Sequence, residues 1–262
     1  MILTLCGALP LGAQEGSPLL RVDVRRVRIS LGFAGQQIFI FGQVPEGTTR
    51  VVSVMEAPPG RPVRLMRKGK VGPFWFGVRQ YAVAGLPTLY LVNMSCPGGN
   101  VLKPCPVPDL LSQVNHVLEK EGVAVGPKTI VRMAKVKVLK GSDSQEAMDQ
   151  LFEGFWKLEA SRGLYGVDDN GIHLTKDGKY FYRAIIPAHA PEAKYTITTY
   201  FLDSDRLIDA ARVELFVSRS GLVAWLARLA ERQAYLYGAI TVFIALAAGL
   251  FVGTIFRRHG GH

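Results

Sequence analysis

The chain has 262 residues, of which 48% are hydrophobic and 20% are charged, and its formal net charge is +10. This length suffices for one large domain or two small ones, and the composition excludes a disordered chain and a membrane protein with many spans. A basic surface attracts anionic lipids, anionic polymers or small anions. Nucleic acid is not an expected partner, because no nucleic-acid-binding motif accompanies the charge.

The first 13 residues carry no charged side chain and end in small residues. Such a stretch is too short to cross a bilayer and has the length of the apolar part of a signal peptide. Residues 1–13 are therefore predicted to be a signal-peptide-like segment, with a buried first strand as the alternative. An export signal implies that the following region folds outside the cytoplasm.

The region 19–95 is rich in short alternating or apolar runs that are separated by glycine and proline. Strands at this spacing are typical of an antiparallel sandwich. The predicted fold class is therefore mainly β, an Ig-like antiparallel β-sandwich of one or two units. The predicted strands are 20–24, 26–31, 36–41, 50–55, 63–67, 74–78, 80–84 and 88–94.

The region 96–165 changes character and is predicted to be a helical insertion or linker. Apolar residues at helical spacing predict one helix over 108–122 and a second from a cap at Ser142 to about Arg162, with a strand or extended connection over 124–139. A second β region follows over 171–217. Its predicted strands are 171–175, 180–186, 194–202 and 206–217.

The C-terminal part is predicted to associate with a membrane. Residues 220–233 have the pattern of a juxtamembrane amphipathic helix. Residues 234–256 contain no charged side chain, and a helix of that length, roughly 34 Å, is long enough to cross the hydrocarbon core. The sequence thus predicts one C-terminal transmembrane α-helix, followed by a cytoplasmic tail over 257–262. The predicted location is the inner (cell) membrane, single-pass, with the N-terminal domain in the periplasm.

Small side chains recur every four residues along this predicted helix, and in lipid such a stripe permits two helices to approach closely. The residues are Thr241, Ala245, Gly249 and Gly253. They predict association with a membrane-protein partner or with a second copy of the chain.

Two features of the outer region are candidate sites. Cys96 and Cys105 bracket a short loop, for which a structural disulfide is the leading interpretation in an oxidising compartment; free thiols and a metal or redox role are the alternatives. The densest basic cluster is interpreted as a charged edge strand, with an anion or headgroup site as the sharper alternative. Its members are Arg61, Arg64, Arg67, Lys68 and Lys70. No catalytic motif, metal-ligand spacing or cofactor is predicted.

Several segments together resemble a family of alphaproteobacterial single-span transmembrane proteins of unknown function. The resemblance depends on turn, core and hairpin positions over 32–35, 38–42, 67–75, 86–90, 186–195 and 237–238. It implies a signal peptide, one C-terminal span and no established active residues. It also implies a sulfite-exporter-type permease as a partner, since such proteins tend to be encoded nearby. Two departures are Ala193, where a hairpin glycine is expected, and the Cys96–Cys105 loop.

Three functions are therefore considered. The leading one is a membrane-anchored periplasmic accessory or interaction module without enzymatic activity. The alternatives are a periplasmic anion-binding partner of a sulfite-exporter-type permease and an uncharacterised periplasmic enzyme. For the last, a structure that lacks a cleft with convergent polar groups would count against it.

Overall fold

The computed structural model describes residues 19–97, 105, 107, 109–141, 144–221, 225, 229–230 and 232–257. Within them the chain forms two compact units. The first unit contains everything up to Val27 and Ala34–Val217, and the second contains Arg28–Phe33 and the chain from Ser218 onward. The signal-peptide-like segment 1–13, the predicted cap Ser142 and the tail from Arg258 lie outside the described residues.

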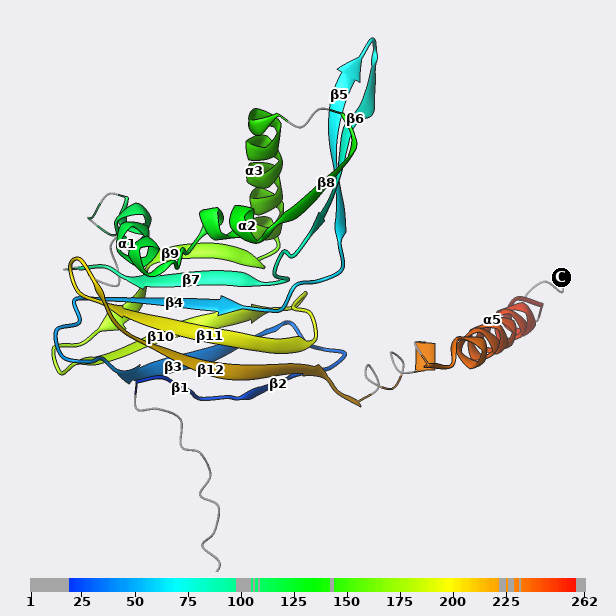
Figure 1. Cartoon of the computed structure of the whole chain (residues 1–262). Coiled ribbons are helices and arrows are strands. Elements are labelled where there is room, and N and C mark those ends of the chain that lie inside the picture. The colour runs from blue at the N-terminus through cyan, green and yellow to red at the C-terminus, as the bar shows by residue number, and fades with distance from the viewer. Residues whose placement is uncertain are drawn as a thin grey trace, which may run out of the picture. The chain divides into compact units, whose positions relative to one another are not determined.

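The main sheet has nine strands and curls strongly (Figure 1). The strand order is β1-β3-β10-β9-β7-β4-β11-β12-β2, and β7 and β9 form a parallel pair. The strands are β1 (Arg21–Val22), β2 (Arg26–Ile29), β3 (Gly35–Gln43), β4 (Arg50–Glu56), β7 (Tyr90–Ser95), β9 (Tyr165–Leu174), β10 (Lys179–Pro187), β11 (Ala193–Leu202) and β12 (Leu207–Arg219).

The N-terminal segment reaches both ends of this sheet. Strands β1 and β2 follow each other in the chain, yet they occupy opposite ends of the strand order. The Asp23 N–H donates to the Phe39 carbonyl on β3 at 3.0 Å, whereas the Arg25 carbonyl accepts from the Phe216 N–H on β12 at 2.9 Å. The two ends of the sheet are therefore held close together.

The interior of the curled sheet is mostly apolar, and it contains a cluster of buried hydroxyl groups. Ser53 on β4 is fully buried, and its hydroxyl lies 2.5 Å from the Tyr182 hydroxyl and 2.9 Å from the Thr199 hydroxyl. The ring of Tyr180 packs edge-on against Phe201, with 5.7 Å between the centroids. Because buried hydroxyls must be paired, this cluster joins β4 to β10 and β11, whose bonded side chains are 129 and 146 residues away from Ser53.

Helices cover the outer face of the sheet near β7 and β9. They are α1 (Leu110–Leu118), the short 3-10 helix η1 (Glu119–Glu121), α2 (Pro127–Met133) and α3 (Gln145–Ser161). Helix α3 begins after Ser144, whose hydroxyl accepts from the Ala147 N–H. Trp156 on α3 packs on Tyr165 at 5.3 Å and on Tyr90 at 6.4 Å, so aromatic contacts fix the helix on the sheet.

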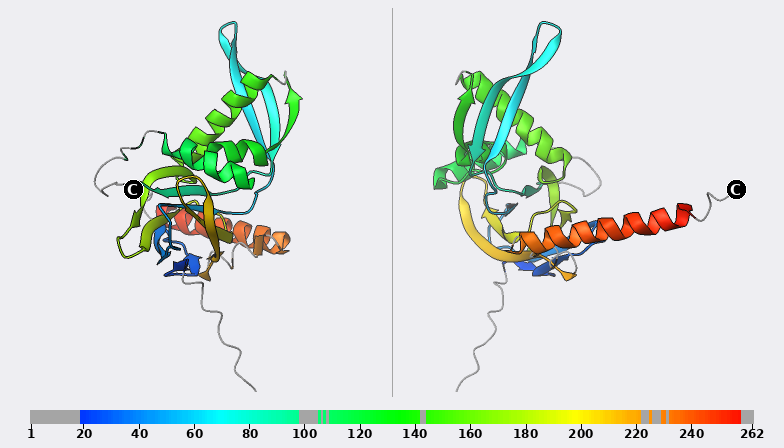
Figure 2. Two further views of the ribbon diagram at one scale, coloured as in Figure 1. Left: turned by 60° about the vertical axis from the view of Figure 1, so that its left-hand side comes forward. Right: turned by 90° about the vertical axis from the view of Figure 1, so that its right-hand side faces the viewer.

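A smaller three-stranded sheet rises from the main sheet, and we call it the arm (Figures 1 and 2). Its order is β5-β6-β8, with β5 (Val63–Val71), β6 (Phe74–Ala84) and β8 (Lys135–Lys140). The predicted strands 74–78 and 80–84 are one continuous strand. The connection predicted over 124–139 contains α2 and β8.

The mainly β character is confirmed, but the Ig-like sandwich is not what forms. The two predicted β regions interleave in one sheet, because β10 pairs with β3 and β11 pairs with β4. Across the sheet, two strands of one region are followed by two strands of the other, and β7 and β9 form a parallel pair. Local alternation of apolar and polar residues cannot distinguish this arrangement from a sandwich, because pairing between distant strands decides it.

The prediction of a C-terminal transmembrane helix is wrong on this structure. Helix α5 (Ala234–Arg257) occupies the predicted place. However, within the described part of the chain no helix combines the length and the apolarity that crossing a membrane requires. Half of the residues of the helix predicted over 220–233 lie outside the described ranges.

Candidate functional site: a basic arm beside an apolar groove

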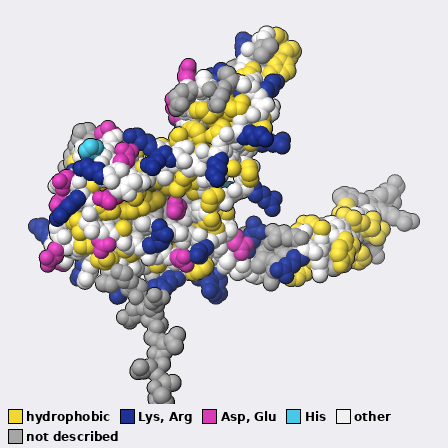
Figure 3. Space-filling model, viewed as in Figure 1, with side chains coloured by type: hydrophobic (Ala, Val, Ile, Leu, Met, Phe, Trp, Pro, Cys, Tyr) yellow, Lys and Arg dark blue, Asp and Glu magenta, His cyan; other side chains and the backbone are white. Residues whose placement is uncertain are grey.

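All the charged residues on the three strands of the arm are basic. They are Arg64, Arg67, Lys68 and Lys70 on β5, Arg79 on β6, and Lys135, Lys137 and Lys140 on β8. These strands therefore carry a formal charge of +8, close to the +10 of the whole chain. The ion pairs seen among the described residues lie elsewhere, on α3 and on β11–β12. The positive charge of the arm thus has no counterpart within it (Figure 3).

The pairing of the strands places like charges opposite each other. Arg67 on β5 lies directly across from Arg79 on β6. On the other face, Arg64 and Lys137 flank Ala82 from the two neighbouring strands. Like charges in such positions repel and destabilise a sheet. An anionic surface brought against the arm would relieve this repulsion.

The tip of the arm presents aromatic side chains. Gly72 and Pro73 form a two-residue turn between Val71 and Phe74, and Gly72 has a φ of 61°, which favours glycine. Phe74 and Phe76 are 64% and 54% exposed, and their rings contact each other edge-on at 6.3 Å. Figure 3 shows hydrophobic side chains at this outer end, with Lys and Arg side chains below them.

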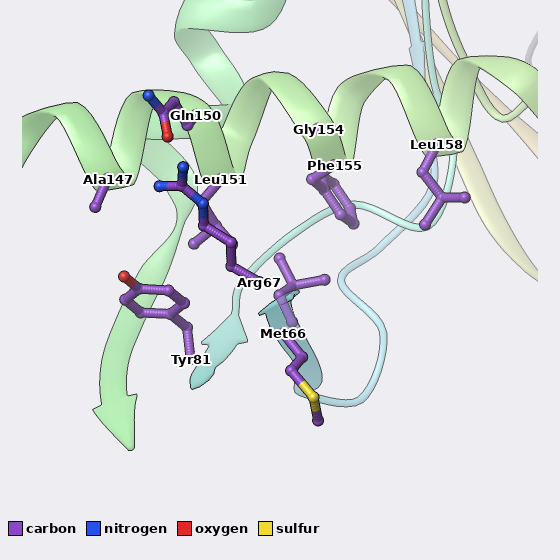
Figure 4. Close-up of a pocket in the computed structure, with 10 residues that line it drawn as sticks. Met66, Arg67, Tyr81, Ala147, Gln150, Leu151, Gly154, Phe155 and Leu158 are labelled. Carbon is purple, nitrogen blue, oxygen red and sulfur yellow. The ribbon is translucent and has the colours of Figure 1, made fainter. Parts of the chain in front are cut away.

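An apolar groove of about 420 Å³ separates the base of the arm from α3. Its floor is the buried ring of Tyr81 on β6, and its helix wall includes Phe155 and Leu158. Figure 4 shows Arg67 extended toward α3 on the side of Gln150, whereas Met66 is turned away from the helix. The groove is open partly because Gly154 has no side chain, and a Cβ there would meet nothing within 4 Å.

The predicted anion-binding residues do not converge on one point. Arg61 precedes β5, whereas Arg64, Arg67, Lys68 and Lys70 are spread along the strand. A nine-residue strand spans roughly 30 Å, and alternate side chains point to opposite faces. Only Arg67 lines the groove beside α3, and Arg61 lines a separate cavity that includes His189. The cluster is an extended charged surface, not a pocket for one small anion.

The other predicted residues belong to parts of the chain outside the arm. Cys96 and Cys105 are joined by a disulfide, with their Cα atoms 5.6 Å apart. Thr241, Ala245, Gly249 and Gly253 lie on α5, where a Cβ at either glycine would meet nothing within 4 Å. Helix association through these four residues stays a prediction.

Sequence reasoning missed the groove and the contribution of β8. The signal for the groove was a glycine at position 154 inside an amphipathic helix, where glycine is costly unless space is needed. The signal for β8 was the alternation of Lys135 and Lys137 with Val136 and Val138, which is typical of a half-exposed strand.

Comparison with known proteins gives one family. Residues 20–258 match the model of the family described as "Putative transmembrane protein (Alph_Pro_TM)". No curated protein and no solved structure matches the chain. The matched range contains the main sheet, the arm and α5.

Proposed function

We propose that this chain, which belongs to the family just described, is a non-enzymatic interaction module. It works at a membrane through the tip of its arm. The family description assigns its members to a membrane. The observation that carries the proposal is the exposed pair Phe74 and Phe76 at the end of strands whose only charges are positive.

The chemistry of the tip fits an anionic lipid surface. Aromatic rings are favoured at the boundary between headgroups and acyl chains. Lys68 and Lys70 lie on the strand that leads into the turn, across from Gly77 and Trp75. Each basic residue held near an anionic membrane contributes about 1 kcal/mol, and the effect fades beyond a Debye length of about 10 Å. The cations closest to the tip therefore matter most.

We place the main sheet and the arm on the periplasmic side of the inner membrane. The Cys96–Cys105 disulfide supports this location, since such bonds persist in oxidising compartments and are rare in the cytosol. Anionic lipid is then the surface that the arm meets. The disulfide loop belongs to a different part of the first unit and takes no part in the proposed contact.

Vesicle co-sedimentation of the purified full chain tests the proposal. We expect wild type to bind vesicles of phosphatidylglycerol and phosphatidylcholine, and to be released by 1 M NaCl. The variant Phe74→Ser/Phe76→Ser should bind at least about tenfold more weakly, because burial of each phenylalanine ring in the lipid contributes up to about 2 kcal/mol to the binding free energy. The variant Lys68→Glu/Lys70→Glu should lose at least about 30-fold, from two favourable charges of about 1 kcal/mol each.

A matched control lies on the main sheet. Phe181 is also an exposed aromatic residue, and Lys176 and Lys179 are exposed cations near it. The variant Phe181→Ser/Lys176→Glu/Lys179→Glu should bind vesicles as wild type does. Equal losses in the control and in the arm variants would refute a specific role for the tip, because they would indicate only nonspecific charge attraction.

A second candidate function is the capture of small soluble anions by the same positive surface. The charge of the arm favours it, although the spread of the cations along β5 does not. Calorimetry with sulfite and phosphate at low salt separates the two functions. Saturable binding with a 1:1 stoichiometry would favour anion capture, and with it a permease partner of the kind that the resemblance implies.

A further inference from the structure

A second cavity, of about 390 Å³, lies on the outer face of the main sheet, and we call it the Glu56 pocket. Glu56, Thr198 and Arg212 line it from three neighbouring strands, β4, β11 and β12. The segment 122–125 and residues of α2 form the opposite wall. The pocket lies within the first unit and shares no lining residue with the groove beside the arm.

Buried hydrogen bonds hold the opposite wall in place. Asn115 on α1 is only 3% exposed, and its amide accepts from the Val125 N–H at 2.8 Å and donates to the Val125 carbonyl at 3.0 Å. The Tyr90 hydroxyl accepts from the Gly126 N–H at 3.1 Å. The Thr129 hydroxyl donates to the Ala124 carbonyl at 2.6 Å. A wall fixed in this way loses little conformational entropy when a ligand binds.

The charged groups of the pocket are close but not paired. The Arg212 guanidinium is near enough to lower the pKa of Glu56, although desolvation of the half-buried carboxyl is the larger effect and raises that pKa. Among the described residues, neither group takes part in an ion pair or a side-chain hydrogen bond. Arg132 on α2 adds a second guanidinium to the lining. A partly desolvated carboxylate is costly unless it is paired, so this arrangement favours a ligand between the two charges.

We propose that the Glu56 pocket binds a small zwitterion of the amino-acid type. The carboxylate of the ligand is bound by Arg212 and Arg132, because guanidinium groups bind carboxylates in a forked geometry. The ammonium group is bound by Glu56, beside Tyr90 and Tyr200, which also line the pocket.

The remaining lining agrees with this class of ligand. Val54 and Met133 contribute apolar surface for an aliphatic or aromatic side chain. The volume lies at the lower end of the range for small-molecule sites, roughly 300–1,000 Å³. Glu56 is the partly buried charge of the pocket, whereas Arg132 and Arg212 are exposed to solvent. A simple anion would leave the Glu56 carboxylate unpaired, and a simple cation would use neither guanidinium, so a ligand with both charges makes the most contacts.

Thermal shift with the purified full chain tests the inference. The twenty proteinogenic L-amino acids are screened singly at 10 mM, and each hit is titrated by calorimetry. We expect at least one to raise the melting temperature. Its methyl ester, which lacks the carboxylate, and its α-keto acid, which lacks the ammonium group, should each bind at least about tenfold more weakly.

Two variants in the pocket and two matched controls complete the test. Glu56→Gln and Arg212→Gln should each weaken binding of the hit by about tenfold or more. Glu46→Gln and Arg183→Gln alter exposed groups outside the pocket and should change nothing. The proposal fails if no amino acid binds wild type, if the ester or keto acid binds equally well, or if the pocket variants bind as the controls do. None of these results depends on whether the arm binds vesicles.

Discussion

The arm and the main sheet differ in how their polar and charged side chains are paired. In the main sheet, a buried cluster of Ser53, Tyr182 and Thr199 is hydrogen-bonded, and the exposed cation Lys194 on β11 has an acidic partner, Glu214 on β12. In the arm, like charges face each other across the strands, and aromatic rings are exposed at the tip. A surface that is left uncompensated in this way is typical of a contact site, whereas the sheet provides the stability.

Amide hydrogen exchange should show the largest difference between the two regions. Amides of β4 over Val52–Met55 lie in a central, buried strand, whereas those of β5 over Arg67–Val71 lie in an exposed edge strand. Exchange in β5 should be faster by two to three orders of magnitude, because exposed regions open locally without global unfolding. Equal protection in the two strands would contradict the proposed division between them.

A substitution in the wall of the Glu56 pocket should lower the unfolding free energy nearly as much as a substitution in the core. Asn115→Leu leaves the Val125 N–H and carbonyl buried without partners, and we expect a loss of about 2–4 kcal/mol in urea unfolding. Ser112→Leu on the exposed face of the same helix is the control and should cost less than about 0.5 kcal/mol. A mild effect of Asn115→Leu would indicate that the wall is not fixed by this side chain.

Removal of one oxygen atom should weaken the hydroxyl cluster inside the main sheet. Tyr182→Phe removes the partner of Ser53, which keeps its contact with Thr199. The unfolding free energy should fall by about 1 kcal/mol, the usual value of one such bond. Urea denaturation measures it, and an unchanged midpoint would indicate that Ser53 is satisfied by Thr199 alone.

The groove beside the arm should tolerate a methyl group. Gly154→Ala places a Cβ in open space within α3 and should stabilise the protein by about 0.5–1 kcal/mol, since glycine is unfavourable in a helix. Thermal unfolding measures the gain. Destabilisation would mean that the groove is narrower than the structure indicates.

The smallest expected effect is the pH dependence of Glu56. Because burial raises its pKa in the folded protein, the native state retains this proton at a higher pH than the unfolded state does. The unfolding free energy of the wild type therefore falls as the pH rises from the pKa of Glu56 in the unfolded state to its pKa in the folded state, and it remains lower at higher pH. Glu56→Gln should be more stable than wild type at pH 7 by less than about 1 kcal/mol, since solvent screens the group. The difference should disappear below about pH 4.

Much of the local structure could be predicted from the sequence. The strands over 36–41, 50–55 and 194–202 and the helices over 108–122 and from near residue 142 occur close to their predicted places, because apolar periodicity reports on burial. Asp203, Ser204 and Asp205 lie in the predicted connection between β11 and β12. In contrast, the second β region was predicted to begin at residue 171, whereas Asp168 to Gly171 already lie within β9, where the register with β7 shifts.

The arrangement of these elements and the candidate sites were less accessible. The pairing of β3 with β10 and of β4 with β11 joins residues 136 to 152 positions apart, and no local pattern encodes such partners. The basic cluster on β5 was visible, but its continuation on β8 was not. The Glu56 pocket requires Glu56, Arg132 and Arg212 to meet, and each alone is an ordinary surface residue.

The contact between Arg25 and Phe216 has a consequence for how the protein matures. During export the first strand emerges long before the last one, so the early segment has one unpaired edge until almost the entire first unit has crossed the membrane. Contacts of such long sequence separation slow folding and prolong the lifetime of aggregation-prone intermediates. The topology of this chain therefore predicts that its folding depends on chaperones. It also predicts that truncation just before β12 prevents folding.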